Sequence, residues 1–261
     1  MSHILPLFKS HYSLGKSILT LEKPRDKNSK LSCADSIFEI LEENSMDKFI
    51  LVDDNPSGYL QASVNAKKFK KTLYFGIRMT YVDNADVKDD ANREGESKIV
   101  VFLKNIDGYK NLIKIWSEAA NRGFYYYPRV DESILSSVDT SNLAVMIPFY
   151  DSYLYRNNFE CKLCTPGFLK YFQTVTFALE DNELPFDDAL RGIVKKAAKD
   201  FNSETEETKS IYYKGREDFL AYLSFRCIDK RASLSKPNLD HMCSEEFCFE
   251  AWKEKNNGIR F

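Results

Sequence analysis

The stretch SKIVVFLKNIDGYKNLIKIWSEAANRGFYYYPRVDESIL, residues 97–135, contains the pattern that decides the fold. Residues 98–103 form a short apolar run that is typical of a buried strand. Residues 107–121 follow it and place Leu112 and Trp116 on the apolar side of a helix. A strand that leads directly into an amphipathic helix is a βα unit.

The same alternation extends in both directions along the chain. Strands are predicted at residues 48–53, 72–77, 143–147 and 171–179, and helices at 35–44, 58–71, 187–201 and 215–226. Strands that alternate with helices predict an α/β protein with a parallel sheet. Periodicity alone leaves open whether that sheet closes into a barrel or stays open.

Length and composition favour one globular domain spanning residues 1–261. The chain has 261 residues, of which 43% are hydrophobic, and closed α/β barrels commonly have this length. Residues 82–97 are polar and nearly free of large apolar side chains, which predicts a mobile loop rather than a domain boundary. Residues 236–261 are of mixed character and are treated as a C-terminal tail.

Charge and the N-terminal sequence restrict the compartment and the partners. The net charge is −2 and the pI is about 6.0, so no global basic field favours nucleic acid or a membrane surface. No apolar stretch approaches the roughly 20 residues of a membrane span, and no export signal is apparent. These features predict a cytoplasmic protein. The frequent use of Lys, Asn, Tyr and Phe is typical of AT-rich genomes, viral genomes among them.

The six cysteines allow two interpretations. Cys161 and Cys164 have the spacing of zinc ligands, and His241, Cys243 and Cys248 could complete such a site. The two groups are far apart in the sequence and neither lies in a glycine-bearing knuckle. Reduced free thiols are therefore the favoured interpretation.

Four stretches, in order, carry a resemblance to a known family. They are FKSHYSLGKSIL (8–19), FILVDDNPSGYLQASVNAKKFKKTLYFGIRMTYV (49–82), residues 97–135, and FALEDNELPFDDALRGIVKKAAKDF (177–201) followed by TKSIYY (208–213). Together they resemble the PHP (polymerase and histidinol phosphatase) domain of the bacterial replicative DNA polymerase III alpha subunit. The resemblance implies an α/β fold with a distorted seven-stranded (β/α) barrel.

The resemblance also implies a chemistry, the hydrolysis of phosphoesters by divalent metal ions held by His, Asp and Glu. The positions that align with the family's ligands are occupied here by Leu7, Lys9, Lys16 or Ser17, Asp53, Asp54, Arg78, Lys98, Phe149, Ser210 and Tyr212. Only Asp53 matches, and the chain has three histidines in all, too few for such a cluster. We therefore expect no bound metal or other cofactor and no catalysis.

Basic residues stand at three of these positions, which suggests two states for the barrel mouth. Lys9, Arg78 and Lys98 could bind an anion such as phosphate. Alternatively, they are solvated or paired with Asp53 and Asp54, which leaves a filled and neutral mouth, and this alternative is favoured.

Two further groups of residues have structural explanations as well as functional ones. Lys67, Lys68, Lys70 and Lys71 could contact nucleic acid, but lysines on an exposed helix face are usually solvent cover. The aromatic run 124–127 could stack on bases, although packing of a loop is the favoured interpretation.

Two functions remain in view. The first is a non-catalytic interaction module that binds a DNA polymerase subunit or a proofreading exonuclease, as a component of a replicase or as a mimic that inhibits it. The second is a metal-dependent phosphoesterase or 3'-5' exonuclease with an altered metal site. The candidate docking surfaces are residues 107–121 and the tail segment 244–252, which carries Phe247, Phe249 and Trp252. The alternative is that both segments are ordinary core, which is favoured for the helix face that bears Leu112 and Trp116. The oligomeric state is left open.

Overall fold

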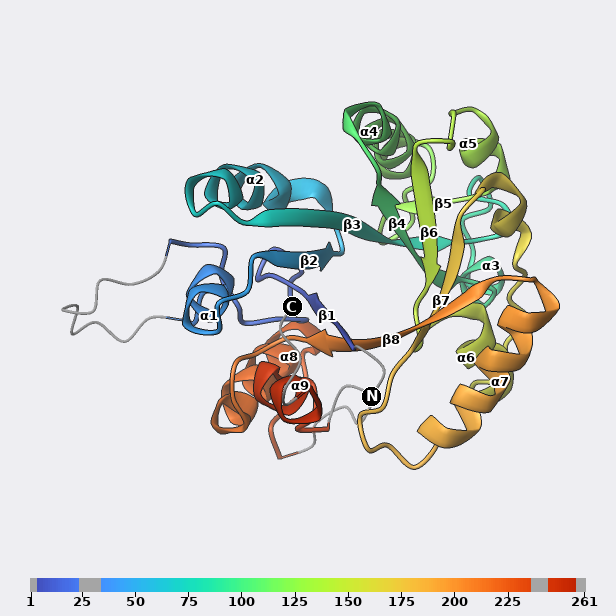
Figure 1. The fold of residues 1–261 in the computed structure, drawn as a ribbon. Helices are drawn as coiled ribbons and strands as arrows, with labels where there is room; N and C mark the ends of the chain where they lie inside the picture. Colours follow the sequence, from blue (N-terminus) through green and yellow to red (C-terminus); the bar gives the residue numbers. More distant parts are fainter. Residues whose placement is uncertain (1–3, 24–33, 236–243, 257–261) are drawn as a thin grey trace. The chain divides into compact units, whose positions relative to one another are not determined.

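The computed structural model describes residues 4–23, 34–235 and 244–256, and strands and helices alternate along much of them (Figure 1). The strands are β1 (Leu5–Phe8), β2 (Lys48–Asp53), β3 (Thr72–Tyr81), β4 (Ser97–Leu103), β5 (Arg129–Val130), β6 (Leu143–Ile147), β7 (Val175–Leu179) and β8 (Glu204–Ile211). The α-helices are α1 (Ile37–Glu43), α2 (Tyr59–Lys68), α3 (Asp90–Glu94), α4 (Ile106–Asn121), α5 (Glu132–Ser136), α6 (Tyr153–Phe159), α7 (Asp187–Asp200), α8 (Phe219–Lys230) and α9 (Phe249–Lys255). Three short 3-10 helices are η1 (Pro56–Gly58), η2 (Gly167–Tyr171) and η3 (Arg216–Asp218).

The strand order confirms the predicted fold class. Hydrogen bonding orders the strands as β2-β1-β8-β7-β6-β4-β3-β5, and β2 also pairs with β3. Seven strands thus form the closed cycle of a barrel, to which β5 is added. The expectation of a parallel sheet was wrong for one strand, because β4 runs antiparallel to both β3 and β6.

The chain divides into two compact units. The first comprises Met1–Phe75, Glu180–Pro185 and Glu207–Phe261, and the second comprises Gly76–Leu179 and Phe186–Glu206. Strands β3 and β8 contribute residues to both units. Each unit is described below by itself.

In the first unit, β1 lies between two parallel partners. Its Leu7 is in register with Ile50 of β2 and with Ser210 of β8. The apolar run of β2 is buried, with Phe49 and Leu51 fully inaccessible to solvent. Strands buried on both faces have such near-continuous hydrophobic sequences, which is why this run could be recognised from the sequence.

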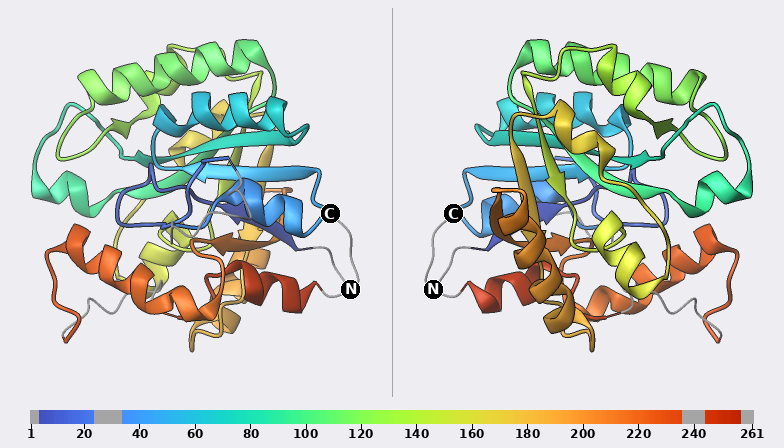
Figure 2. Two further views of the ribbon diagram at one scale, coloured as in Figure 1. Left: turned by 90° about the vertical axis from the view of Figure 1, so that its left-hand side faces the viewer. Right: turned by 90° about the vertical axis from the view of Figure 1, so that its right-hand side faces the viewer.

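The C-terminal segment completes the core of the first unit. Figure 2 shows α9 (red) beside the start of β1, and there Trp252 donates its indole N–H to the carbonyl of Ile4 at 2.9 Å. Phe247, Phe249 and Trp252 are 0%, 4% and 5% exposed. The proposal that these aromatic side chains form a docking surface was therefore wrong, since they fill the core of their own unit.

In the second unit, α4 confirms the βα pattern of residues 97–135. Asn105 caps it by accepting hydrogen bonds from the amides of Asp107 and Gly108 at 3.1 and 2.9 Å. A Cβ atom on Gly108 would lie 2.3 Å from the carbonyl oxygen of Asn142, so no larger residue fits there. This contact lets the first turn of α4 approach the start of β6 closely.

The polar segment 82–97 has more structure than its composition predicts. It contains helix α3, whose first turn is capped by the side chain of Asp89. The carboxylate of Asp131 accepts a hydrogen bond from the amide of Ala85 at 2.9 Å, and the side chain of Asn92 donates to the carbonyl of Val87 at 2.9 Å. Side-chain hydrogen bonds to the backbone, rather than apolar burial, define this segment, and hydrophobic periodicity is blind to them.

Several boundaries shift by a few residues. Strand β3 continues past residue 77 to Tyr81, β7 begins at Val175 rather than Tyr171, and α8 begins at Phe219 rather than Gly215. Among the described residues, no helix combines the length and hydrophobicity that crossing a bilayer requires.

Candidate functional site

The carboxyl ends of β1, β2 and β8 bring together the first-unit positions singled out from the sequence. The amide of Lys9 donates to the carbonyl of Ile211 at 3.1 Å and so continues the β1–β8 pairing beyond β1. Strand β2 ends at Asp53, and Tyr212 directly follows β8. Functional residues of α/β folds gather at this end of the strands.

Asp53 is fully buried and its carboxylate accepts three hydrogen bonds. One oxygen accepts from the amide of Ser10 and the hydroxyl of Ser13, both at 2.8 Å. The other accepts from the hydroxyl of Ser10 at 2.7 Å. Buried charges are stabilised by such donors, so the loop after β1 satisfies this carboxylate with protein groups.

Lys9 and Asp54 form an ion pair beside this carboxylate. The Nζ of Lys9 lies 2.7 Å from an Oδ of Asp54, and the Lys9 side chain is only 6% exposed. The adjacent acids thus have different partners, because Asp53 is the last residue of β2 and Asp54 already lies beyond the strand. Pairing of Lys9 with Asp54 matches the favoured expectation for this lysine.

Ser17 ties the ends of β1 and β8 together. Its hydroxyl lies 2.6 Å from the carbonyl of Lys9 and 2.8 Å from the carbonyl of Tyr212. The ring of Tyr212 stacks on Phe247, with centroids 5.4 Å apart and planes inclined by 7°. The resemblance aligns Ser17 and Tyr212 with ligand positions. Here the Ser17 hydroxyl binds two backbone carbonyls, and the Tyr212 ring packs against another aromatic ring.

Glu180 is a buried acid that the sequence reasoning missed. Its carboxylate accepts from the hydroxyl of Ser210 at 2.7 Å, from the amide of Ser210 at 3.2 Å and from the side chain of Asn182 at 2.9 Å. Burial raises the pKa of this carboxyl group above its ordinary value. Glu180 directly follows the apolar strand β7, as Asp53 ends β2, and that shared signature could have identified it.

The second unit gives each of its basic candidates a partner of its own. Arg78 forms an ion pair with Asp151. The Nζ of Lys98 lies 2.6 Å from the hydroxyl of Thr80 and 5.0 Å from the ring centre of Tyr127. Phe149 is 1% exposed and belongs to the core. Anion binding by Lys9, Arg78 and Lys98 stays a prediction.

Comparison with known proteins assigns this arrangement to a family. Residues 9–207 match the family model of the PHP domain. The chain belongs to the PHP domain family. The resemblance stated from the four sequence stretches is confirmed, and the PHP domain matched here includes both Lys9 and Asp53.

The similar curated proteins are much longer than this chain. The DNA polymerase III subunit alpha of Campylobacter jejuni is 24% identical over 187 residues, which cover 64% of this chain and 15% of that protein. The subunit of the same name from Treponema pallidum is 26% identical over 157 residues, covering 57% and 13%. A crystal structure of a Bifidobacterium adolescentis protein, assigned as a metal-dependent phosphoesterase, shares 9% identity with a TM-score of 0.44 and covers 78% of this chain and 87% of that one.

The donor set of this PHP domain departs from that of a metal centre. Within residues 4–23, 34–235 and 244–256, no three His, Cys, Asp or Glu side chains gather as a metal site would require. The residues present at the carboxyl ends of β1, β2 and β8 do not fit a divalent metal cluster, since hydroxyls and an ammonium group already occupy the carboxylates.

The candidate zinc ligands are only partly described. Cys161 is exposed, whereas Cys164 is buried and its thiol donates to the carbonyl of Glu96 at 3.1 Å. Burial raises the pKa of the Cys164 and Cys248 thiols, which disfavours the thiolate that zinc binds. His241 and Cys243 lie outside the described residues.

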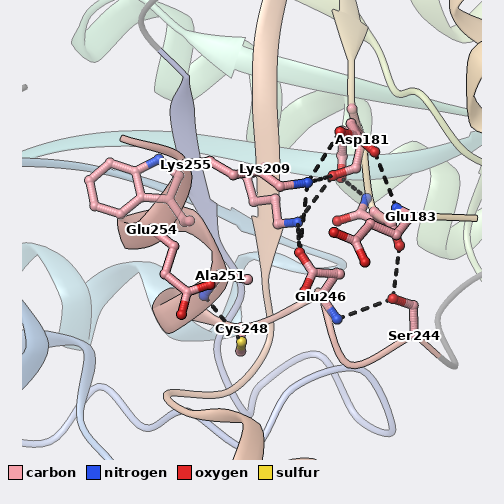
Figure 3. A network of polar contacts seen from close by, with 12 residues as sticks. Asp181, Glu183, Lys209, Ser244, Glu246, Cys248, Ala251, Glu254 and Lys255 are labelled. Carbon is pink, nitrogen blue, oxygen red and sulfur yellow. Dashed lines mark hydrogen bonds and ion pairs between the residues drawn. The ribbon is translucent and has the colours of Figure 1, made fainter. Parts of the chain in front are cut away.

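A second polar network fastens the C-terminal segment to β8. Figure 3 shows Lys209 and Lys255 side by side between Asp181 and Glu246. The Nζ of Lys209 lies 3.1 Å from both the Asp181 carbonyl and the Glu246 carboxylate, and burial lowers the pKa of this amine. Arg216 adds ion pairs to Glu246 and Glu254, each at 2.9 Å. The network is structural, because its contacts join elements of the first unit's own core.

Proposed function

We propose that this PHP domain is non-catalytic and is an interaction module of DNA replication. Its partner is a polymerase of the DNA polymerase III type or the associated proofreading exonuclease. The domain either supports that partner or, as a mimic, competes with the partner's own PHP domain. The three hydrogen bonds that Ser10 and Ser13 donate to the buried Asp53 carboxylate are the observation that carries the non-catalytic part.

Metal binding would require the Asp53 carboxylate to exchange protein donors for an ion. Three donors lie within 2.8 Å of its oxygens, and the site is closed to solvent. A divalent ion would also meet the ammonium group of Lys9, which repels it. Both effects oppose the chemistry by which PHP phosphoesterases activate water.

The interaction part of the proposal rests on the relatives. Both are polymerase subunits by name, and this chain spans only about one seventh of their length, 15% and 13%. A PHP domain that does not catalyse a reaction can still function by binding a partner through its surface. Among the candidate surfaces, the exposed face of α4 remains, since the aromatic tail residues are buried.

A binding experiment with purified components tests this proposal. The tagged protein should retain the polymerase subunit from its native cell, identified by mass spectrometry and then titrated as a pure protein. Reversing Lys110 and Lys114 on α4 to Glu should weaken that binding, whereas reversing Lys67 and Lys68 on α2 is the control matched in charge. Recovery of the tagged protein alone, or equal binding by both double variants, would contradict the proposed role of α4.

A further inference from the structure

Helix α8 carries apolar side chains on two faces, and the described residues of its own unit bury only one of them. Tyr222 and Cys227 on the inner face are buried at 0% and 6% exposure. On the outer face, Leu220 and Ile228 are 64% and 75% exposed. A helix that is hydrophobic all round is normally buried all round. Helix α8 is orange in Figure 2, and the large aliphatic side chains on its outer face are unusually exposed.

The outer face has a regular spacing centred on Ser224. Leu220 and Ile228 lie four residues before and after it, so the three side chains form one stripe along the helix. Ser224 is small, and its hydroxyl is directed back to the carbonyl of Leu220 at 2.8 Å. A small residue between two large ones allows another helix to approach closely at the centre of the stripe.

Charged residues flank the stripe just outside both ends of α8. Glu217 lies in η3, seven residues before Ser224, and Arg231 is the C-cap of α8, seven residues after Ser224. Both are exposed, and no ion pair involves either of them among the residues described. An exposed acid thus precedes the first turn of α8, and an exposed base follows its last turn.

We propose that this face binds a second copy of the chain through an antiparallel pair of α8 helices, with the two-fold axis at Ser224. In that arrangement Leu220 meets Ile228 of the partner subunit, and Glu217 meets Arg231 of the partner subunit. A two-fold interface requires such a self-complementary surface. The inference does not depend on the proposed replication function.

The loop after β1 widens this surface beyond a single helix. Gly15 has a φ of +66°, and a Cβ atom there would lie 2.3 Å from the Cβ of Asp229. The loop thus lies against the last turn of α8, where Leu14 is 73% exposed. Additional apolar area matters because stable interfaces bury about 1,200–2,000 Å² in total, more than one short helix pair provides.

The symmetry of charge and side-chain size favours a copy of the chain over other occupants. Nucleic acid would meet the acidic end at Glu217 as well as the basic end. An anionic lipid surface would be repelled there in the same way. An unrelated helix would bind such a face equally well in principle, but it would not require matching residues at equal distances from Ser224.

Cross-linking at the proposed axis gives a direct test. Under mild oxidation, full-length Ser224→Cys protein should form a covalent dimer whose disulfide joins the two substituted positions, as peptide mapping would show. Ser117→Cys on α4 is the matched control, because Ser117 also directs its hydroxyl to the carbonyl four residues earlier, at 2.8 Å. Equal cross-linking of both variants, or none for Ser224→Cys, would overturn the proposal.

Charge exchange provides an independent test by sedimentation equilibrium. Glu217→Lys or Arg231→Glu alone should raise the dimer dissociation constant about tenfold, since each change places like charges together at two symmetric sites. Glu217→Lys combined with Arg231→Glu should restore dimerisation. Leu220→Glu should abolish it and Leu60→Glu on α2, where Leu60 is 73% exposed, should not. The proposal would be contradicted if the wild-type protein stayed monomeric at 100 times the protein concentration used for cross-linking. It would also be contradicted if the double variant had a normal melting temperature but did not form dimers.

Discussion

The ammonium nitrogen of Lys9 lies 2.7 Å from a carboxylate oxygen of Asp54, next to the buried carboxylate of Asp53. The sequence resemblance aligns all three positions with metal ligands of the PHP domain family. The ammonium group of Lys9 thus supplies, next to these acids, the positive charge that a metal ion would supply in a PHP metal site. A cation that belongs to the chain can stabilise the strand ends without supplying Lewis acidity.

Lys9→Met should destabilise the protein by about 2 kcal/mol, because Asp54 loses its counter-ion in a partly buried place. The loss is smaller than for a fully buried pair since the Asp54 side chain is 28% exposed. Urea denaturation would measure it. Adding Asp54→Asn should recover most of the loss, and a double variant as unstable as the sum of both single variants would count against the pairing.

Asp53→Asn and Asp53→Ala should differ strongly in stability. An amide retains an acceptor for the Ser10 amide and the Ser13 hydroxyl, so Asp53→Asn should cost about 1 kcal/mol. Asp53→Ala leaves buried donors without an acceptor and should cost about 3 kcal/mol or more. Thermal and urea denaturation would compare them, and equal destabilisation by both changes would refute a hydrogen-bonding role for Asp53.

Glu180 should make the stability of the protein depend on pH. Burial raises its pKa in the folded state, so the folded protein binds this proton more tightly than the unfolded chain does. Its contribution is therefore most favourable below the ordinary glutamate pKa of about 4.3 and is lost as the pH rises through the folded-state value. The difference in unfolding free energy between wild type and Glu180→Gln should fall over that range. A difference that is constant with pH would show that Glu180 does not titrate in this way.

Trp252→Ala should behave as a core substitution. It removes a side chain that is 5% exposed and should destabilise the protein by about 3–5 kcal/mol. Trp252→Phe keeps most of the packing but loses the hydrogen bond to Ile4, and about 1 kcal/mol should be lost. Native-like stability of Trp252→Ala, together with loss of partner binding, would restore the docking role that its burial argues against.

The fold could be predicted because its strands and helices carry local patterns. The apolar run of β4 and the amphipathic α4 were both visible in residues 97–135. The direction of β4 was not, because the same apolar run can pair with its neighbours in either direction. Burial of Phe249 and Trp252 was missed because the segment that covers them lies near the N-terminus.

The candidate site was predictable in part. The resemblance located Lys9, Asp53 and Asp54, and composition suggested charge pairing. The roles of Ser10 and Ser13 were not foreseen, because serines in a loop usually have no recognisable pattern. Glu180 is not among the positions that align with the family's ligands, and its only signal in the sequence is that it directly follows an apolar strand.

The measurement that tests the central claim most directly is the metal content of the purified protein after dialysis, combined with manganese-dependent hydrolysis of a chromogenic phosphate ester. The account predicts no more Mn, Fe or Zn than in a buffer blank, and the same hydrolysis rate for wild type and Asp53→Asn. Two or more tightly bound equivalents, with hydrolysis that manganese stimulates and Asp53→Asn abolishes, would contradict the account.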